Sequence, residues 1–286
     1  MSNNLPKAFL FGAGTTGRSL LPIVSKDYQV MGYLDNDPSL YSREHNPPVF
    51  TPEMAIGKMD FDVIVIGSYP GMRPITKQLL DLGVEQGKII TKYVSTQVEA
   101  RILFLDRLGE MLYEKGIDGS VAEGGVFQGD FAKEINRVFP DRKLYLFDTF
   151  SGFDARDVSM ELEKGFSNSE AGRLSATNEN AVLKILPHPE LCAIRKGYFP
   201  ESAEGLDNET FCFVNLDFDL YLPTYAGLEF FAPRMSDGGV ILVHDYFSEG
   251  FKGVKKAVEE YSKKNALYLF PIGDGVSIGI RCNASN

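Results

Sequence analysis

Two glycine-rich turns constrain the fold of this sequence more than any other feature. Residues 12–17 read GAGTTG and residues 123–129 read EGGVFQG, and each turn follows an apolar run and precedes a helix-like segment. In each case a second apolar run ends in an aspartate, Asp35 or Asp148, about 20 residues further on. This arrangement is typical of parallel α/β units that bind ligands at the carboxyl ends of their strands. The chain therefore predicts two α/β units in tandem.

The bulk composition agrees with two globular domains. The chain has 286 residues, of which 44% are hydrophobic and 24% charged, so two sizeable cores can form. A net charge of −10 disfavours nucleic acid as a partner, and no apolar run approaches the length of a membrane span. Cys192, Cys212 and Cys282 are scattered without a CxxC spacing, which favours reduced thiols in a cytoplasmic protein. The oligomeric state is left open, with a homo-oligomer among the options.

Residues 1–94 are expected to form a small Rossmann-like domain. Strands are predicted at residues 8–11, 29–34, 61–66 and 88–92, and helices at residues 16–24 and 74–82. The run at residues 8–11 leads directly into the glycine turn, so we interpret it as a strand and not as part of a signal peptide. The predicted nucleotide contacts of this domain are Gly12, Gly14, Gly17 and Asp35.

This first unit is short for a dinucleotide-binding fold and has no second half to hold a nicotinamide. It resembles the small Rossmann-like domains at the start of sialic-acid-type and bacillosamine acetyltransferases, which implies a nucleotide or nucleotide-sugar ligand. The alternative is that its glycines serve packing, and that the unit is a scaffold or a dimer surface.

A helical linker is predicted at residues 95–118, and a second α/β domain at residues 119–286. Its parallel strands are predicted at residues 120–123, 143–147, 191–196, 211–216 and 240–243. Two last strands, at residues 266–270 and 276–281, are expected to form an antiparallel hairpin through the glycine-rich residues 273–275. Residues 154–177 are polar and lack a clear period, so we expect a mobile insertion or lid over the site there.

The second glycine turn and Asp148 indicate a ligand with an acidic end and a ribose. Glycines let the backbone approach a ligand closely, and the N-terminus of the following helix offers free N–H groups to a carboxylate. Asp148 is placed to accept hydrogen bonds from ribose hydroxyls, and residues 195–200 follow the third strand at the same edge. The alternatives are a tight turn without a ligand and a helix-capping role for Asp148.

Four segments carry a specific resemblance: AEGGVFQGDFAKEIN, LFDTFSGF, KGYFPES and NLDFDLYLPTYAGLEFFAPRMSDGGVILVHDY, in this order. Together they resemble the macrocin O-methyltransferase (TylF-type) family from about Arg101 to the C-terminus, with the Rossmann-like domain as an N-terminal addition. The resemblance implies the class I methyltransferase fold, a doubly wound sheet finished by an antiparallel hairpin. It also implies O-methylation of a hydroxyl on a sugar, nucleotide sugar or glycosylated metabolite. The methyl donor would be S-adenosylmethionine (SAM), with help from a divalent metal, usually Mg²⁺.

The resemblance also assigns cofactor contacts by motif position. The implied contacts are Glu123, Gly124, Gly125 and Gly129 for the methionine and sugar region, Asp148 and Thr149 for the ribose, and Lys196, Gly197, Tyr198 and Phe199 for the adenine.

Acidic side chains and a histidine follow the fourth and fifth predicted strands of the second unit: Asp217 and Asp219, then His244 and Asp245. These strand ends are expected to be neighbours, so the four side chains could bind one divalent ion that activates the acceptor hydroxyl. The family usually has an acidic or amide pair where His244 stands, and imidazole favours Zn, Mn, Fe or Ni over Mg²⁺. His244 and Asp217 are the candidate catalytic residues, with His244 alternatively the general base without a metal. The simplest alternatives are a structural histidine, and aspartates that cap the helix near Pro223.

Two other functions stay open at this point. The N-terminal fingerprint alone fits an NAD-dependent oxidoreductase, and loss of the metal site through His244 fits a non-catalytic nucleotide-binding scaffold. The distinctive segments all lie in the second unit, which favours the O-methyltransferase.

Overall fold

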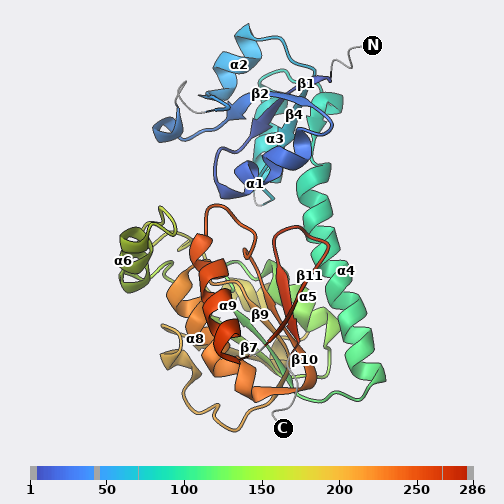
Figure 1. Cartoon of the computed structure of the whole chain (residues 1–286). Coiled ribbons are helices and arrows are strands. Elements are labelled where there is room, and N and C mark those ends of the chain that lie inside the picture. Colours follow the sequence, from blue (N-terminus) through green and yellow to red (C-terminus); the bar gives the residue numbers. More distant parts are fainter. Residues whose placement is uncertain (1–4, 42–45, 70, 266, 282–286) are drawn as a thin grey trace. The chain divides into compact units, whose positions relative to one another are not determined.

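The computed structural model describes residues 5–41, 46–69, 71–265 and 267–281. It divides into two compact units: the chain up to Glu99 with Ser248–Gly250, and Ala100–Phe247 with the chain from Phe251 onward. Figure 1 shows an α/β sheet in each unit, and each sheet has a hydrophobic core on both faces. Cys282 and Ala266, which entered the sequence predictions, lie outside the described residues.

The first unit holds a five-stranded sheet in the order β3-β2-β1-β4-β5, with every neighbouring pair parallel. Its strands are β1 Lys7–Phe11, β2 Gln29–Leu34, β3 Val49–Phe50, β4 Val63–Ile66 and β5 Ile89–Ile90. Its α-helices are α1 Thr15–Val24, α2 Pro52–Lys58 and α3 Met72–Asp81. Strands alternate with helices along the chain, as expected of a parallel sheet.

Strand β3 and helix α2 were absent from the sequence prediction. Strand β3 spans two residues, too few for a two-residue period to show. Helix α2 starts at Pro52 and is capped by the preceding Thr51, whose hydroxyl accepts a hydrogen bond from Met54 N at 3.1 Å. The helix buries only Pro52 and Ala55, so no apolar stripe marks it in the sequence.

Helix α4, Lys92–Glu114, begins three residues before the helical linker predicted at residues 95–118 and ends four residues before its end. Leu105, Leu108 and Leu112 form a buried stripe on it and pack into the core of the second unit. Arg101 lies on the same stripe, one helical turn before Leu105. Among the described helices, α4 included, none is long and apolar enough to cross a membrane.

The second unit holds a seven-stranded sheet in the order β11-β12-β10-β9-β6-β7-β8. Its strands are β6 Ser120–Gly124, β7 Leu144–Asp148, β8 Cys192–Lys196, β9 Phe211–Leu216, β10 Met235–Val243, β11 Tyr268–Pro271 and β12 Ile278–Arg281. Strands β6 to β10 are parallel, and the hairpin of β11 and β12 pairs antiparallel with β10. The predicted doubly wound sheet with a terminal antiparallel hairpin is confirmed.

Helices cover both faces of this sheet (Figure 1). One core receives residues from α4, α5 (Asp130–Val138) and α7 (Glu179–Ile185), and the other from α6 (Ala155–Lys164), α8 (Tyr221–Phe231) and α9 (Lys252–Asn265). Successive residues of a strand enter opposite cores, as the pleat requires: Tyr145 faces one and Leu146 the other. The strand order reverses between β6 and β9, which makes the carboxyl edge there the expected ligand site.

The polar segment at residues 154–177 contains a helix, contrary to the irregular insertion predicted. Helix α6 is capped at its start by Asp154, whose side chain accepts a hydrogen bond from Arg156 N, and at its end by Gly165 in the left-handed conformation. Its buried face includes the acids Asp157 and Glu161. Because these buried residues are charged, the hydrophobic period that would reveal the helix is missing from the sequence.

Candidate functional site

The register of the second sheet brings three strand ends together. Gly124 of β6 pairs with Leu216 of β9, and Leu216 pairs with Val243 of β10. The pairing continues beyond the strands, because Asp217 N donates to Gly124 O at 2.7 Å and His244 N donates to Leu216 O at 2.9 Å. Asp217 and His244 therefore leave the sheet side by side at its carboxyl edge, next to the glycine turn.

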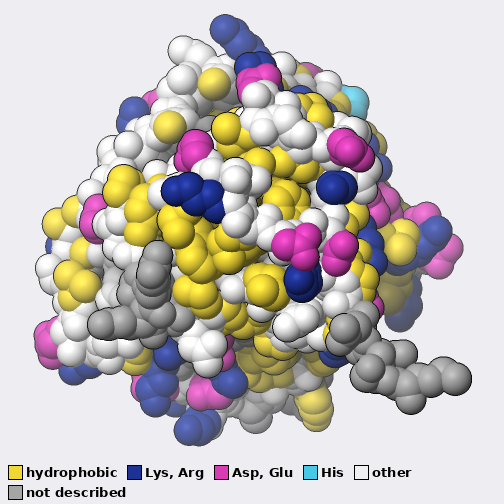
Figure 2. Space-filling view, turned by 90° about the horizontal axis from the view of Figure 1, so that it is seen from above, with side chains coloured by type: hydrophobic (Ala, Val, Ile, Leu, Met, Phe, Trp, Pro, Cys, Tyr) yellow, Lys and Arg dark blue, Asp and Glu magenta, His cyan; other side chains and the backbone are white. Residues whose placement is uncertain are grey.

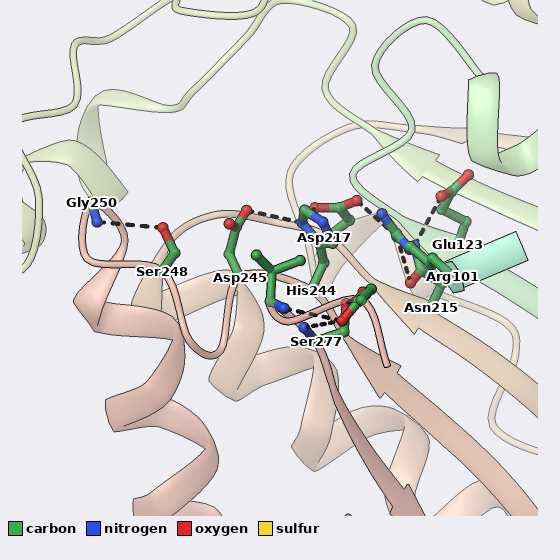
Figure 3. Close-up of polar contacts among 11 residues, drawn as sticks. Arg101, Glu123, Asn215, Asp217, His244, Asp245, Ser248, Gly250 and Ser277 are labelled. Atoms are coloured by element: carbon green, nitrogen blue, oxygen red, sulfur yellow. Dashed lines mark hydrogen bonds and ion pairs between the residues drawn. The ribbon is translucent and has the colours of Figure 1, made fainter. Parts of the chain in front are cut away.

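Two carboxylates and an imidazole form a cluster at this edge (Figure 3). Nδ1 of His244 lies 3.0 Å from Asp217 Oδ1 and 3.0 Å from Asp245 Oδ2. One ligand atom from each of the three residues lies within 4.8 Å of the others. Asp219, the fourth predicted ligand, is not part of this group, although its charge acts on the neighbouring Asp245. The structure thus brings together three of the four predicted ligands.

Two of these aspartates have an unusual backbone conformation. Asp219 and Asp245 adopt φ values of 63° and 58°. Residues other than glycine rarely occupy this left-handed region, and strain of this kind, on the order of 1 kcal/mol, is concentrated at functional sites. Asp219 does not cap α8, because Leu220 occupies the N-cap position and the N–H of Tyr221 in the first turn donates to Glu161 Oε1 at 2.8 Å. The side chain of Asp217 contacts Arg101 and His244 instead, so the capping alternative for Asp217 and Asp219 has no support in the geometry.

Burial and charge together set the pKa values in the cluster. Burial lowers the pKa of His244, but the carboxylates of Asp217 and Asp245 outweigh it and raise this pKa to about 10. Burial raises the pKa of Asp217, but His244 and Arg101 outweigh it and hold this pKa below its usual range. Burial and the neighbouring carboxylates raise the pKa of Asp219 well above its usual value. Without a cation, His244 therefore carries a proton between two carboxylates near neutral pH.

The geometry of the cluster fits a divalent cation in place of that proton. Ligands at right angles around an ion at about 2.1 Å lie about 3.0 Å apart, and both His244–carboxylate distances are 3.0 Å. Carboxylate oxygens suit a hard cation, whereas the imidazole nitrogen favours Mn²⁺, Fe²⁺ or Zn²⁺ over Mg²⁺. The donor set therefore fits a divalent ion and does not point to Mg²⁺ specifically.

Two residues of this network were absent from the sequence prediction, Arg101 and Asn215. Arg101 Nη2 donates to Asn215 Oδ1 and to Asp217 Oδ2, each at 3.0 Å, and Asn215 Nδ2 donates to Glu123 Oε1 at 2.9 Å. Figure 3 shows these contacts running from Glu123 to Asp217. Both residues have a signal in the sequence: Arg101 interrupts an apolar helix stripe, and Asn215 interrupts the apolar run of a buried strand. Buried polar groups at such positions need hydrogen-bond partners.

Glu123 lies between this network and the glycine turn. It is the penultimate residue of β6, all of which is buried, and is 2% exposed. Its Oε1 accepts the hydrogen bond from Asn215, while Oε2 is buried with no partner among the described residues. Burial and the charge of Asp217 raise the pKa of Glu123 well above its usual value. An unpaired buried carboxyl oxygen beside a glycine turn is suited to receive a donor group from a ligand.

The glycines of the turn have a packing role of their own. At Gly125, where φ is +82°, a Cβ would lie 2.0 Å from the carbonyl oxygen of Asp217. A Cβ on Gly124 would lie 2.3 Å from the ring of Phe218. Gly129 precedes α5 with φ +84°. The first two glycines therefore let the turn lie directly against the loop that carries Asp217.

Asp148 ties the glycine turn to the end of β7. Its Oδ2 accepts hydrogen bonds from Val126 N at 2.8 Å and Phe127 N at 2.9 Å, and its Oδ1 accepts one from Phe150 N at 2.7 Å. The next helix, α6, has its own cap at Asp154. Asp148 therefore binds the backbone of the glycine turn and does not cap helix α6.

The remaining predicted cofactor contacts are mostly engaged in local structure. Thr149 Oγ1 donates to Gly152 O at 2.7 Å, and Lys196 pairs with Glu179 of α7 at 2.7 Å. Three residues of the predicted adenine loop, Gly197, Tyr198 and Phe199, follow β8. The Tyr198 hydroxyl donates to Asp157 Oδ1 at 2.7 Å, and the Phe199 ring, 4% exposed, packs among the aromatic rings of the core. The Phe199 ring therefore offers no face to a ligand.

The first unit repeats the arrangement of turn and aspartate. Asp35 Oδ2 accepts a hydrogen bond from Ala13 N at 2.7 Å. A Cβ on Gly17 would lie 1.9 Å from the carbonyl oxygen of Gly12, so α1 packs directly on the start of the turn. At Gly14 a Cβ would meet open space. Close packing therefore requires a glycine at position 17, whereas it does not require one at position 14.

The sheet order and the glycine turn place the second unit in the class I methyltransferase fold. Solved structures share it: the O-methyltransferase NovP, 24% identical, covers 64% of this chain and 80% of its own with a TM-score of 0.51. The calicheamicin methyltransferase CalS11, 17% identical, covers 75% and 86% with a TM-score of 0.52. The chain belongs to the macrocin-O-methyltransferase (TylF) family, whose sequence model matches residues 92–272. Residues 4–90 match a second model, described as C2185-like, N-terminal.

Two relatives match the second unit in sequence. The 8-demethyl-8-(2,3-dimethoxy-alpha-L-rhamnosyl)-tetracenomycin-C 4'-O-methyltransferase of Streptomyces olivaceus is 26% identical over 165 residues, which are 53% of this chain and 61% of that protein. The mycinamicin III 3''-O-methyltransferase of Micromonospora griseorubida is 24% identical over 179 residues, 58% of this chain and 69% of that protein. The match thus spans under two thirds of the length of the first relative.

Proposed function

We propose that this chain is a SAM-dependent O-methyltransferase that methylates a hydroxyl of a sugar, nucleotide sugar or glycosylated metabolite. A divalent ion held by Asp217, His244 and Asp245 assists the reaction. The observation that carries the proposal is the convergence of the glycine turn, Asp148 and the acidic cluster at one sheet edge in a chain of the TylF family.

Several polar groups at this edge remain available to SAM. Asp148 Oδ1 accepts one hydrogen bond and can accept a second from a ribose hydroxyl. Glu123 Oε2 is unpaired among the described residues, and the start of α5 offers free N–H groups to a carboxylate. We assign Glu123 and the glycine turn to the methionine end and Asp148 to the ribose. The loop after β8 then contributes its backbone and Tyr198 near the adenine.

The acidic cluster is the proposed acceptor site. An ion bound there would lower the pKa of the acceptor hydroxyl and orient its oxygen toward the methyl carbon of SAM. Asp217 and Asp245 would each offer one carboxylate oxygen, and His244 its Nδ1. Because methyl transfer is an in-line displacement, holding the two reactants in line contributes much of the rate. The rigid strand ends that carry Asp217 and His244 are suited to this task.

A second candidate mechanism uses His244 as the general base without a metal. Both carboxylates contact Nδ1 of His244, and no hydrogen bond joins its Nε2 to another described residue. An imidazole held at one nitrogen by carboxylates presents the other nitrogen to a substrate hydroxyl. This role needs the neutral imidazole, and because the pKa of His244 is raised to about 10 the metal-free mechanism would operate at alkaline pH. The effect of a chelator on turnover separates the two mechanisms.

The proposed acceptor class rests on the relatives. The protein from Streptomyces olivaceus is named for a rhamnosyl derivative of tetracenomycin C, and the one from Micromonospora griseorubida for mycinamicin III. Both are named as O-methyltransferases. We therefore extend sugar-hydroxyl methylation to this chain.

The N-terminal unit is proposed as an accessory domain, residues 1–94, that supplies no group to methyl transfer. Gly12, Gly14, Gly17 and Asp35 form its candidate nucleotide site, and the open space at Gly14 leaves room for a ligand next to the start of α1. The helical linker at residues 95–118 and the catalytic domain at residues 119–286 complete the proposed organisation. The macrocin-O-methyltransferase match covers the second unit, so it favours the methyltransferase over an NAD-dependent oxidoreductase that would use the first unit.

A homo-oligomer is proposed from the surface. Figure 2 shows hydrophobic side chains gathered over the middle of one face, with Lys, Arg, Asp and Glu around them. Contiguous exposed apolar patches mark protein–protein contacts more often than isolated apolar residues do. Light scattering of the full chain measures the oligomeric state, and a monomer at all concentrations would contradict this proposal.

Parallel calorimetry with SAM and with NAD(H), followed by turnover on a panel of sugar-containing acceptors, tests the main proposal. We expect SAM to bind and turnover to disappear in the presence of a chelator. Binding of NAD(H) with no binding of SAM would favour the oxidoreductase. Binding of SAM with no turnover on any acceptor would favour the non-catalytic scaffold.

A further inference from the structure

Arg101 is the one residue of helix α4 that reaches the acidic cluster among the described contacts. Its side chain is 11% exposed, and Nη2 donates to both Asn215 Oδ1 and Asp217 Oδ2 at 3.0 Å. The guanidinium carbon lies 3.8 Å from the ring centre of Phe131. The neighbouring Asn215 is itself held, because it donates to Glu123 Oε1. Stacking and hydrogen bonds therefore hold the guanidinium in one orientation.

This contact gives the two oxygens of Asp217 different partners. Oδ2 accepts the hydrogen bond from Arg101, while Oδ1 lies 3.0 Å from His244 Nδ1 in the cluster. Because Oδ2 is hydrogen-bonded to Arg101, it is not available to bind an ion in the cluster. As long as Arg101 is in place, Asp217 can offer a cation one oxygen, not two.

We propose that Arg101 determines which divalent ion the cluster accepts, by keeping Asp217 a monodentate ligand. Small ions such as Mg²⁺ bind few protein oxygens in near-ideal octahedral geometry. Ca²⁺ takes more oxygen ligands and uses bidentate carboxylates. Arg101 thus disfavours Ca²⁺ without contacting the ion. This inference rests on the metal site of the proposed function.

The charge of Arg101 has to be separated from its geometric role. Glu123, Asp217, Asp219 and Asp245 are four acids near one arginine and one histidine. Removing the positive charge of Arg101 strengthens the attraction of the cluster for every divalent ion to a similar degree. The ratio of two dissociation constants cancels this shared effect. A change in this ratio therefore reports a change in how many oxygens of Asp217 coordinate the ion.

The test compares Arg101→Met with a matched control on the same helix, Arg107→Met. Arg107 is 69% exposed and pairs only with Glu110 among the described residues. Isothermal titration of the full chain with MgCl₂ and with CaCl₂, without SAM or acceptor, gives both dissociation constants. We expect Arg101→Met to shift the ratio toward Ca²⁺ by about tenfold, because Asp217 can then chelate with both oxygens. Arg107→Met should leave the ratio unchanged.

Equal shifts of both constants in Arg101→Met, or no shift, would overturn the inference. If Arg101→Met does not fold, as judged by circular dichroism, Arg101→Lys decides. Lysine keeps the charge but has no planar group to stack on Phe131, so we expect a smaller shift of about threefold toward Ca²⁺. A wild-type ratio in Arg101→Lys would then overturn the inference. Wild-type protein that binds none of Mg²⁺, Ca²⁺ and Mn²⁺ would refute the proposed metal site together with this inference. Binding of Mn²⁺ without Mg²⁺ moves the comparison to the ratio of the Mn²⁺ and Ca²⁺ constants, and an unaltered ratio in the variants would refute this inference alone.

Discussion

In both α/β units an aspartate at the end of the second strand holds the glycine turn that follows the first strand. Asp35 accepts a hydrogen bond from Ala13 N at 2.7 Å, and Asp148 accepts one from Val126 N at 2.8 Å. The shared contact connects residues about 20 positions apart, which is why both pairs could be found in the sequence. It stabilises the turn whether or not a ligand is bound.

The two units differ on the other side of the first strand. In the first unit β4 ends at Ile66 and is followed by the uncharged Gly67 and Ser68, whereas in the second unit β9 is followed by Asp217. Among the described residues, the group able to hold a metal lies in the second unit. The two units thus share the glycine turn and the aspartate at the carboxyl edge of the sheet, and they differ in the residues at the neighbouring strand end. The chemistry at that edge depends on the strand ends across the switch point.

The largest expected effect comes from removing the acid that has no counterpart in the first unit. Asp217→Ala should lower turnover by about a thousandfold, because the acceptor hydroxyl would lose both the proposed ion and the orientation that this ion provides. A chelator should have the same effect on the wild type while SAM still binds. The matched control is Asp35→Ala in the first unit, which should leave turnover unchanged. Full turnover in chelator-treated enzyme would contradict the metal-assisted mechanism and favour His244 as the general base.

His244→Asp distinguishes the two roles of the histidine. As a ligand, His244 can be replaced by a carboxylate, so turnover should be retained and the preferred ion should move toward Mg²⁺. As the general base, its loss should cut turnover about a hundredfold with metal affinity little changed. We expect the first outcome, read from initial rates with a series of divalent ions.

Asp148→Ala and Asp35→Ala compare the same position in the two units. Loss of Asp148 frees the glycine turn and removes the ribose acceptor, so SAM affinity should fall by roughly 1–3 kcal/mol. Asp35→Ala should not change SAM affinity. Calorimetry on the two variants and the wild type gives the comparison, and equal affinities in all three would refute the role assigned to Asp148.

Removal of the first unit should have a small effect on the cofactor. A chain that begins at Val94 keeps Arg101 and most of α4. We expect it to bind SAM within about twofold of the full chain, since every assigned SAM contact lies after residue 119. A folded shortened chain without SAM affinity would show that the first unit contributes to the site.

The smallest expected effect is a dependence of stability on pH. Burial raises the pKa of Asp157 from 3.8 to about 6. The folded chain therefore holds this proton more tightly than the unfolded chain, and the free energy of unfolding falls as pH rises from about 4 to about 6. Asp157→Asn should remove this part of the pH dependence. Melting temperatures measured across that range test it, and parallel curves for the variant and the wild type would contradict it.

The sequence by itself determined every described strand except β3, both glycine turns, the aspartates at the strand tips and the terminal hairpin. These features are local, because each follows from the period or the turn chemistry of one segment. The neighbouring ends of the fourth and fifth strands could also be expected, since the order of a doubly wound sheet is restricted. That much placed Asp217, His244 and Asp245 at one edge.

Only the tertiary structure decided which distant polar groups complete the cluster. Arg101 meets Asn215 and Asp217 from 114 and 116 residues away, and no local pattern specifies such a pairing. Helix α6 could not be predicted from the sequence for a related reason: its buried face includes the acidic residues Asp157 and Glu161, which interrupt the hydrophobic period. A hydrophobic pattern reports that a segment has a face to bury. It does not report which acidic or basic side chains are buried in the folded chain. Their burial depends on hydrogen bonds to residues far away in the sequence, and a local pattern contains no information about those partners.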